Sequence, residues 1–266
     1  MSTTTVTAAS PSVELHNPAG LGPVVLLCEH ASHHIPSLYN ELGLDSAHRY
    51  SHAAWDPGSR DLALQLSQEL DAPLIAGRIS RLVYDCNRPP EAASAMPERS
   101  EIIEVPGNRR LTLAQRHERI ESVYRPFCNS VSRVIEPRIE QRHPTALVTV
   151  HSFTPDYHGR SRAVEIGVLH DADSRLADAI LDQAPCLGHR NIQRNAPYGP
   201  EDGVTHSLKL HGISHDLPNV MLEIRNDLLT TQEDIRVMAR ELLQLLEPAL
   251  TELGLTRSGP KGSNHA

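Results

Sequence analysis

The chain has 266 residues, enough for one large α/β domain or two small ones. It carries 33 acidic against 25 basic residues, and the formal net charge of −8 argues against a nucleic-acid-binding protein, which needs a basic surface. Lys209 and Lys261 are the only lysines, so the basic residues are almost all arginine, and there are 16 histidines. Arginine binds carboxylates in a bidentate way and histidine is the commonest metal ligand.

The sequence contains no run of 18 apolar residues, so we expect no transmembrane helix and no membrane partner. The first 20 residues lack the basic start and apolar centre of a secretory signal. The four cysteines are far apart and form no CxxC pair; they are Cys28, Cys86, Cys128 and Cys186. This pattern fits a reduced protein and predicts a cytoplasmic location.

The first half of the chain predicts three strands and one helix. The strands are expected at 23–28, 73–76 and 81–85, and the helix at 59–70, where Leu62, Leu66 and Leu70 have helical spacing. Residues 91–110 are rich in proline, glycine and charge and have no clear period, so we expect a long loop there.

The second half continues the alternation of helices and strands. A helical stretch is expected at 111–142, broken near Pro126 and Pro137, followed by strands at 146–150, 165–169 and 219–225, helices at 173–184 and 231–253, and a polar loop at 185–203. The alternation predicts an α/β sheet covered by helices on both faces. We expect one domain over 20–254, with 1–19 and 255–266 as flexible tails.

Ionisable side chains cluster at the ends of four predicted strands. They are Glu29 and His30, then Asp85, Asn87 and Arg88, then His151, and last Glu223 and Arg225. Ligands of open α/β sheets bind at the carboxyl ends of the strands, so these side chains are expected to form one site.

The residue types in this set indicate a hydrolytic metal site. A catalytic zinc ion takes three protein ligands and leaves one position for water. His30 and His151 are the best ligand candidates because each directly follows a strand. Asp56 is the first choice for the third ligand, and Glu29 and His33 are rivals. Zinc is expected, although manganese or iron could use the same ligands.

Two further residues suit a hydrolase acting on a carboxylate-bearing substrate. Glu223 lies in an apolar strand, where burial would raise its pKa and suit a general base. Arg88 could grip a substrate carboxylate in a bidentate way, with Asn87 beside it and Arg81 and Arg225 as helpers. Side chains two apart on a strand share a face, so Glu223 and Arg225 are expected to face the same space. The sequence contains no HEXXH motif, no GxSxG nucleophile elbow and no glycine-rich phosphate motif.

The motifs of this chain resemble those of the N-formylglutamate amidohydrolase family. The matching stretches span residues 23–228 in order and include SRLVYDCNRPP at 80–90, VTVHSF at 148–153 and MLEIRND at 221–227. Characterised histidine-degradation members usually carry Pro-His-Ser-Gly at the first strand exit, whereas this chain has Glu29-His30-Ala31-Ser32. This departure leaves a different N-acyl or N-formyl substrate open.

The resemblance implies a fold and a reaction. The fold would be a mixed α/β sheet flanked by helices, similar to zinc carboxypeptidases (phosphorylase/hydrolase-like). The reaction would be hydrolysis of an N-acyl amino acid, with formate and glutamate as products from N-formylglutamate. By the same likeness His30, Asp56 and His151 would bind zinc, Asn87 and Arg88 would hold a substrate carboxylate, and Glu223 would be the catalytic glutamate.

Two other functions remain open at this point. One is a metal-dependent peptidase or another deacylase on the same fold. The other is a non-catalytic protein that binds a small molecule, although such a protein has no need of a base such as Glu223.

Overall fold

A seven-stranded mixed sheet forms the centre of the protein. The computed structural model describes residues 12–256, and the strand order is β1-β3-β2-β6-β11-β9-β10. The strands are β1 (Val13–His16), β2 (Val24–Cys28), β3 (Leu74–Gly77), β6 (Ala146–Phe153), β9 (Ile166–Leu169), β10 (Ile192–Arg194) and β11 (Asn219–Arg225). Strands β3, β2, β6 and β11 are parallel, whereas β1 and β9 run antiparallel to β3 and β11.

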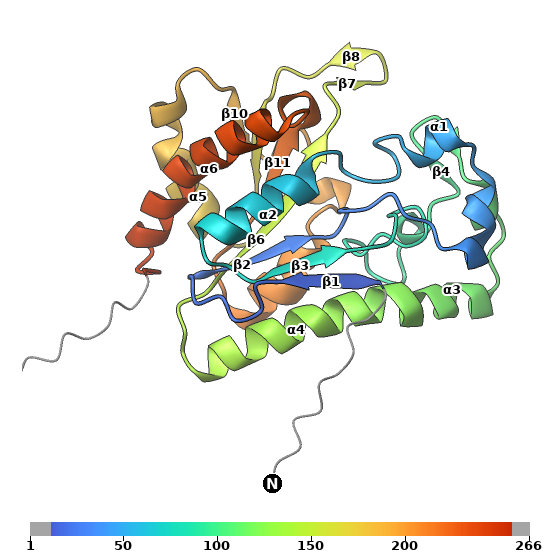
Figure 1. The fold of residues 1–266 in the computed structure, drawn as a ribbon, viewed down its shortest axis with the longest axis horizontal. Coiled ribbons are helices and arrows are strands. Elements are labelled where there is room, and N and C mark those ends of the chain that lie inside the picture. Colours follow the sequence, from blue (N-terminus) through green and yellow to red (C-terminus); the bar gives the residue numbers. More distant parts are fainter. Residues whose placement is uncertain (1–11, 257–266) are drawn as a thin grey trace, which may run out of the picture.

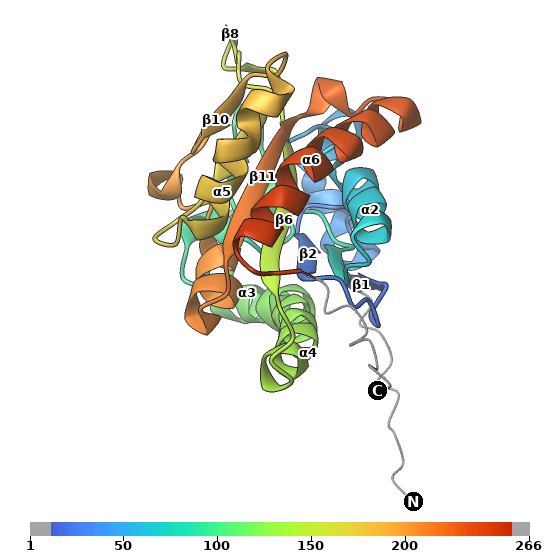
Figure 2. The same cartoon turned by 90° about the vertical axis from the view of Figure 1, so that its left-hand side faces the viewer.

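Helices cover both faces of this sheet. The covering helices are α2 (Ser59–Glu69), α4 (Arg125–Glu140), α5 (Arg175–Gln183) and α6 (Gln232–Glu252), and the two other α-helices are α1 (Ser46–Arg49) and α3 (Leu113–Arg119). Figure 1 shows α2 and α6 above the strands and α4 below them, and Figure 2 shows α5 in the same layer as α2 and α6. None of the helices within residues 12–256 has the length and apolar character that crossing a membrane requires.

Strand β2 is buried on both sides and separates two hydrophobic cores. Val24, Leu26 and Cys28 pack with the helices α2, α5 and α6, while Val25 and Leu27 pack with α4 on the other face. Each fully buried leucine contributes about 1.5–3 kcal/mol to stability. A central strand that is apolar at every position therefore requires cover on both faces, as predicted.

Most of the predicted elements are confirmed. The strands expected at 23–28, 73–76, 146–150, 165–169 and 219–225 and the helices at 59–70, 173–184 and 231–253 are all present, although β6 extends to Phe153. Helix α6 begins after Thr231, whose hydroxyl accepts a hydrogen bond from the Asp234 amide at 3.1 Å.

The prediction of a strand at 81–85 is wrong, because residues 81–83 form a turn and residues 84–85 have no regular secondary structure. Leu82, Val83 and Tyr84 are buried in the second core without joining the sheet. Side chains supply the hydrogen bonds that a neighbouring strand would otherwise give. Asn108 donates to the Leu82 carbonyl at 2.8 Å and Arg119 to the Val83 carbonyl at 3.1 Å. A short apolar run predicts burial, but it does not distinguish a strand from such a buried loop.

Both edge strands of the sheet were missed. Residues 13–16, predicted to belong to a flexible tail, form β1 and pair in register with β3. The predicted start of the domain at residue 20 is therefore wrong, because the sheet gains a strand before it. Strand β10 lies inside the predicted polar loop 185–203. Residues 1–11 and 257–266 of the predicted tails lie outside the described residues.

The predicted breaks in the helical stretch 111–142 are also wrong. A π-helical segment, Ile120–Tyr124, joins α3 to α4. Pro126 lies in the first turn of α4 and Pro137 lies inside α4, and neither ends the helix. Two small hairpins complete the structure: β4 (Arg99–Ser100) with β5 (Ile103–Glu104), and β7 (Asp156–Tyr157) with β8 (Arg160–Ser161).

Candidate active site

Three parallel strands bring the predicted site residues together at one edge of the sheet. Glu29 and His30 follow β2, His151 lies near the end of β6, and Glu223 lies in β11. The register places Glu223 directly opposite His151. Asp56 comes from the turn that precedes α2, and its backbone amide donates to the His30 carbonyl at 3.0 Å.

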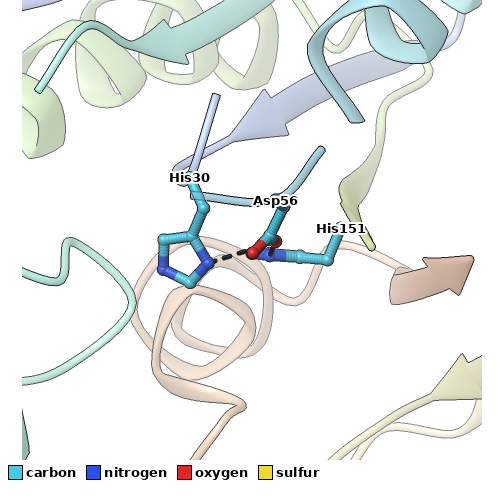
Figure 3. Close-up of side chains that lie close together, drawn as sticks. All are labelled: His30, Asp56 and His151. Carbon is cyan, nitrogen blue, oxygen red and sulfur yellow. Dashed lines mark hydrogen bonds and ion pairs between the residues drawn. The ribbon is translucent and has the colours of Figure 1, made fainter. Parts of the chain in front are cut away.

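Asp56 lies between the two predicted histidine ligands. Its Oδ2 atom is 3.2 Å from Nδ1 of His30 and 2.8 Å from Nδ1 of His151, as Figure 3 shows. The candidate ligand atoms of these three residues all lie within 4.8 Å of one another, and all three residues are buried. One oxygen and two imidazole nitrogens thus converge in an arrangement that suits a divalent metal.

The outer nitrogen of each histidine faces a second carboxylate. Nε2 of His30 is 2.7 Å from Oδ1 of Asp85, and Nε2 of His151 is 3.2 Å from Oε2 of Glu29. Metal-binding histidines nearly always present their other nitrogen to such an acceptor. The donor set therefore fits a metal ion, to which both histidines would present Nδ1.

The two rivals for the third ligand lie elsewhere. Glu29 contacts the outer nitrogen of His151 and is not one of the three converging residues. The His33 ring packs against the rings of Tyr50 and Trp55 at steep angles of 56° and 68°, with centroid distances of 4.7 and 5.1 Å. The geometry therefore favours Asp56.

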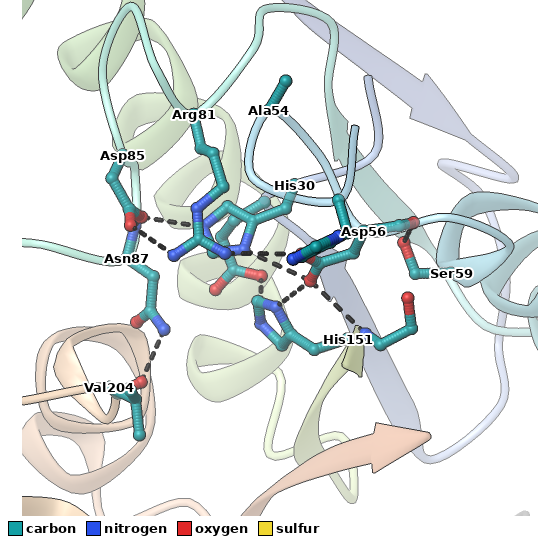
Figure 4. A network of polar contacts seen from close by, with 12 residues as sticks. His30, Ala54, Asp56, Ser59, Arg81, Asp85, Asn87, His151 and Val204 are labelled. Carbon is teal, nitrogen blue, oxygen red and sulfur yellow. Dashed lines mark hydrogen bonds and ion pairs between the residues drawn. The ribbon is translucent and has the colours of Figure 1, made fainter. Parts of the chain in front are cut away.

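Charge stabilises the carboxylate of Asp56. Burial raises its pKa, but His30 and His151 outweigh this effect and lower the pKa well below its usual range. Arg81 adds an ion pair to Asp56 at 3.4 Å and another to Asp85 at 3.0 Å, as Figure 4 shows. Asp56 is thus ionised at neutral pH, as a metal ligand must be.

Glu223 is buried and its pKa is raised. Burial is the main cause, the negative charge of Asp56 adds to it, and the pKa reaches about 7. Its Oε2 atom has no hydrogen-bond partner among the described residues, and the side chain lines the cleft described below. A carboxylate with a pKa near neutrality can both accept and return a proton.

Arg88 and Asn87 differ in how free their side chains are. Arg88 lines the cleft, donates to the Asp202 carbonyl at 3.1 Å and lies 3.8 Å from Asp85. Asn87 uses both ends of its amide internally: Oδ1 accepts from the Ser207 amide at 2.9 Å and Nδ2 donates to the Val204 carbonyl. Asn87 also lines the cleft, and its Nδ2 carries a second N–H, so its contact with a substrate carboxylate stays a prediction.

The expectation that Arg225 faces the same space as Glu223 is wrong. Arg225 is the last residue of β11, where the chain turns away from the sheet. Its guanidinium pairs with Asp227 at 2.8 Å and donates to the Arg162 carbonyl at 3.2 Å, and it does not line the cleft.

A cleft of about 410 Å³ opens above the three converging residues. Beyond the predicted residues, its walls include Arg99 of β4, Tyr157 of the β7–β8 hairpin and Tyr198. Arg162 stacks over the Tyr157 and Tyr198 rings, 4.3 and 4.9 Å from their centroids. The sequence held no signal for these residues, because they lie in loops and hairpins without periodicity.

The comparison with known families finds a match that covers most of the chain. A sequence model of the family described as N-formylglutamate amidohydrolase matches residues 22–230. The chain belongs to this family. Membership in the N-formylglutamate amidohydrolase family makes it a hydrolase by descent, and the matched range includes His30, Asp56, His151 and Glu223.

Two solved structures share the fold of this N-formylglutamate amidohydrolase family member. The gene product Atu2144 from Agrobacterium tumefaciens is 50% identical, with a TM-score of 0.90, and the match covers 93% of this chain and 98% of that one. N-formylglutamate amidohydrolase from Ralstonia eutropha JMP134 is 18% identical, with a TM-score of 0.71 and coverage of 91% and 99%. No curated protein matches the chain.

Proposed function

We propose that this protein is a metal-dependent amidohydrolase that removes a formyl or other small acyl group from the nitrogen of a carboxylate-bearing amino acid. For N-formylglutamate, water adds across the amide bond, so the products are formate and glutamate. The observation that carries the proposal is the convergence of His30, Asp56 and His151 within 4.8 Å, beside the buried Glu223.

His30, Asp56 and His151 would hold the metal ion through Nδ1, a carboxylate oxygen and Nδ1. A divalent ion bound there, with zinc as the first choice, would polarise the acyl oxygen and acidify a water molecule. The likeness to zinc carboxypeptidases belongs to this proposal as well, since the same donor types serve hydrolysis in them.

Glu223 would act as the general base and then as the general acid. With its pKa near 7, its carboxylate can take a proton from the attacking water. The same proton then passes to the amide nitrogen as the carbon–nitrogen bond breaks. The hydroxyl group stays on the acyl carbon, so the acyl group leaves as a carboxylate and the amino acid as an amine.

Arg88 would anchor the substrate carboxylate. Its guanidinium lines the cleft, and its nearest carboxylate, Asp85, lies 3.8 Å away, so it retains donors for a bidentate contact. Arg81 already pairs with Asp56 and Asp85, and it would help by neutralising those charges.

A formate-release screen over N-formyl amino acids, run with metal analysis of the same preparation, tests the proposal. We expect bound metal and the fastest formate release from acidic N-formyl amino acids. Release of free amino acids from dipeptides, without formate release from N-formyl compounds, would favour a peptidase instead. Protein that takes up no metal and hydrolyses none of these compounds would favour a binding protein.

A further inference from the structure

Glu29 is a buried carboxylate that the proposed reaction does not use. It is only 2% exposed, and within residues 12–256 its one ion pair is the contact of Oε2 with Nε2 of His151 at 3.2 Å. The Ser207 hydroxyl also lies beside this carboxylate. A buried, ionised carboxylate is costly unless it is paired, so the imidazole is the partner that accounts for it.

The backbone holds Glu29 firmly beside β6. The residue follows β2, which pairs with β6 on one side and β3 on the other. The strand β3 ends at Gly77, where a Cβ atom would lie 2.3 Å from the Glu29 carbonyl oxygen. This close approach needs glycine, and it fixes where the Glu29 side chain begins.

We propose that Glu29 is a positioning residue that accepts the Nε2–H of His151 and thereby turns the lone pair of Nδ1 toward Asp56 and the metal. The inference rests on the proposed function, because it concerns the metal that His151 would bind. A neutral imidazole has one N–H group, so an acceptor at Nε2 leaves Nδ1 free as a ligand.

The carboxylates that face His30 and His151 differ in their other partners. Asp85, which faces His30, also pairs with Arg81 at 3.0 Å and accepts from the Asn87 amide at 2.9 Å. Glu29 has no arginine or lysine ion pair among the described residues. His151 is its only ion-pair partner among the described residues, so its removal should be felt directly in the metal affinity of that ligand.

Zinc affinity, measured by chelator competition on the purified full-length protein, tests this role without relying on activity. Glu29→Met removes the acceptor at similar length, whereas Glu29→Gln keeps an amide oxygen that can accept the Nε2–H. We expect Glu29→Met to bind zinc about 10–100-fold more weakly than the wild type and Glu29→Gln to lie between them.

Glu241→Met is the matched control. Glu241 is also a buried carboxylate that contacts a histidine, with His189 at 2.9 Å and Arg190 at 2.9 Å, but it lies on α6 away from the cleft. We expect its zinc affinity to equal that of the wild type. Glu29→Met within about twofold of the wild type would overturn the inference, and so would an equal loss in Glu241→Met. A wild type that takes up no zinc would instead contradict the proposed function.

Imidazole NMR of the zinc-loaded wild type gives a second test that needs no variant. In protein labelled with ¹⁵N at histidine, we expect the His151 signals to show a protonated Nε2 and a metal-bound Nδ1. Metal bound at Nε2 of His151 would overturn the inference even if every Glu29 variant failed to fold.

Discussion

His151 and Glu223 are opposite one another in neighbouring parallel strands. The ladder between β6 and β11 pairs the two residues in register, and both strands are buried in the middle of the sheet. The proposed metal ligand and the proposed base are therefore fixed relative to each other by backbone hydrogen bonds. A site on rigid strands keeps the geometry that proton transfer requires.

Glu223→Gln tests the base directly. The amide is close in size but cannot accept the proton, so we expect turnover to fall by about 10²–10⁴-fold while zinc stays bound. Steady-state rates and elemental analysis on the same sample check both parts. A rate close to that of the wild type would remove Glu223 from the mechanism.

Arg88→Ala tests the carboxylate anchor. We expect kcat/KM for a carboxylate substrate to fall about 10²-fold, mainly through a higher KM, because the bidentate contact is lost. The control is the same substrate with its carboxylate replaced by a carboxamide. For this substrate, Arg88→Ala should lower kcat/KM only slightly. If both substrates weaken equally, Arg88 does not recognise the carboxylate.

Gly58 holds the turn that carries Asp56. Its φ is +80°, and a Cβ atom there would lie 2.4 Å from Cβ of Leu229. Gly159 has a similar φ of +73° but open space around it. Each alanine substitution carries about 1–2 kcal/mol of backbone strain, and Gly58→Ala adds about 1–3 kcal/mol of overlap.

Urea denaturation of the two variants separates these effects. We expect Gly58→Ala to lower the free energy of unfolding clearly more than Gly159→Ala. Equal losses in the free energy of unfolding would show that the structure removes the overlap with Leu229 without further destabilisation.

His211 makes stability depend on pH in mildly acid solution. The residue is 4% exposed, and burial lowers its pKa from 6.5 to about 4. Between these values the unfolded chain protonates His211 and the folded protein does not, so the contribution of His211 to stability falls as the pH drops from 6.5 to 4. The full effect is about 3 kcal/mol.

In metal-free protein, His211→Gln should remove this contribution to the free energy of unfolding. Urea denaturation between pH 4 and 6.5 measures it. His117→Gln is the control, because the His117 side chain is 70% exposed. An unchanged acid slope in His211→Gln would show that His211 is not the group responsible.

The parts of the fold that were predictable are those with a strong local pattern. The β-branched run in β2 and the leucine spacing of α2 and α6 follow from burial on one or two faces. Strands β1 and β10 gave no such pattern because an edge strand buries little. The apolar run at 82–84 was misread because side chains of distant residues satisfy its carbonyls.

The candidate site also has parts that could be predicted from the sequence and parts that could not. His30, His151 and Glu223 were predictable because they lie in or directly after strands, whose ends meet at one edge. The roles of Glu29, Asn87 and Arg225 depend on which way each side chain turns. Contacts with residues far away in the sequence decide this, such as Asn87 with Ser207 and Arg225 with Arg162.

Zinc content after metal loading, measured by elemental analysis, tests the central claim most directly when wild type, His151→Ala and His33→Ala are compared. His33 was a rival ligand, but its ring packs against Tyr50 and Trp55, so it serves as the control. We predict stoichiometric zinc in the wild type and in His33→Ala, and its loss in His151→Ala. Zinc retained in His151→Ala, or lost equally in His33→Ala, would contradict the assignment of His30, Asp56 and His151 as the metal ligands.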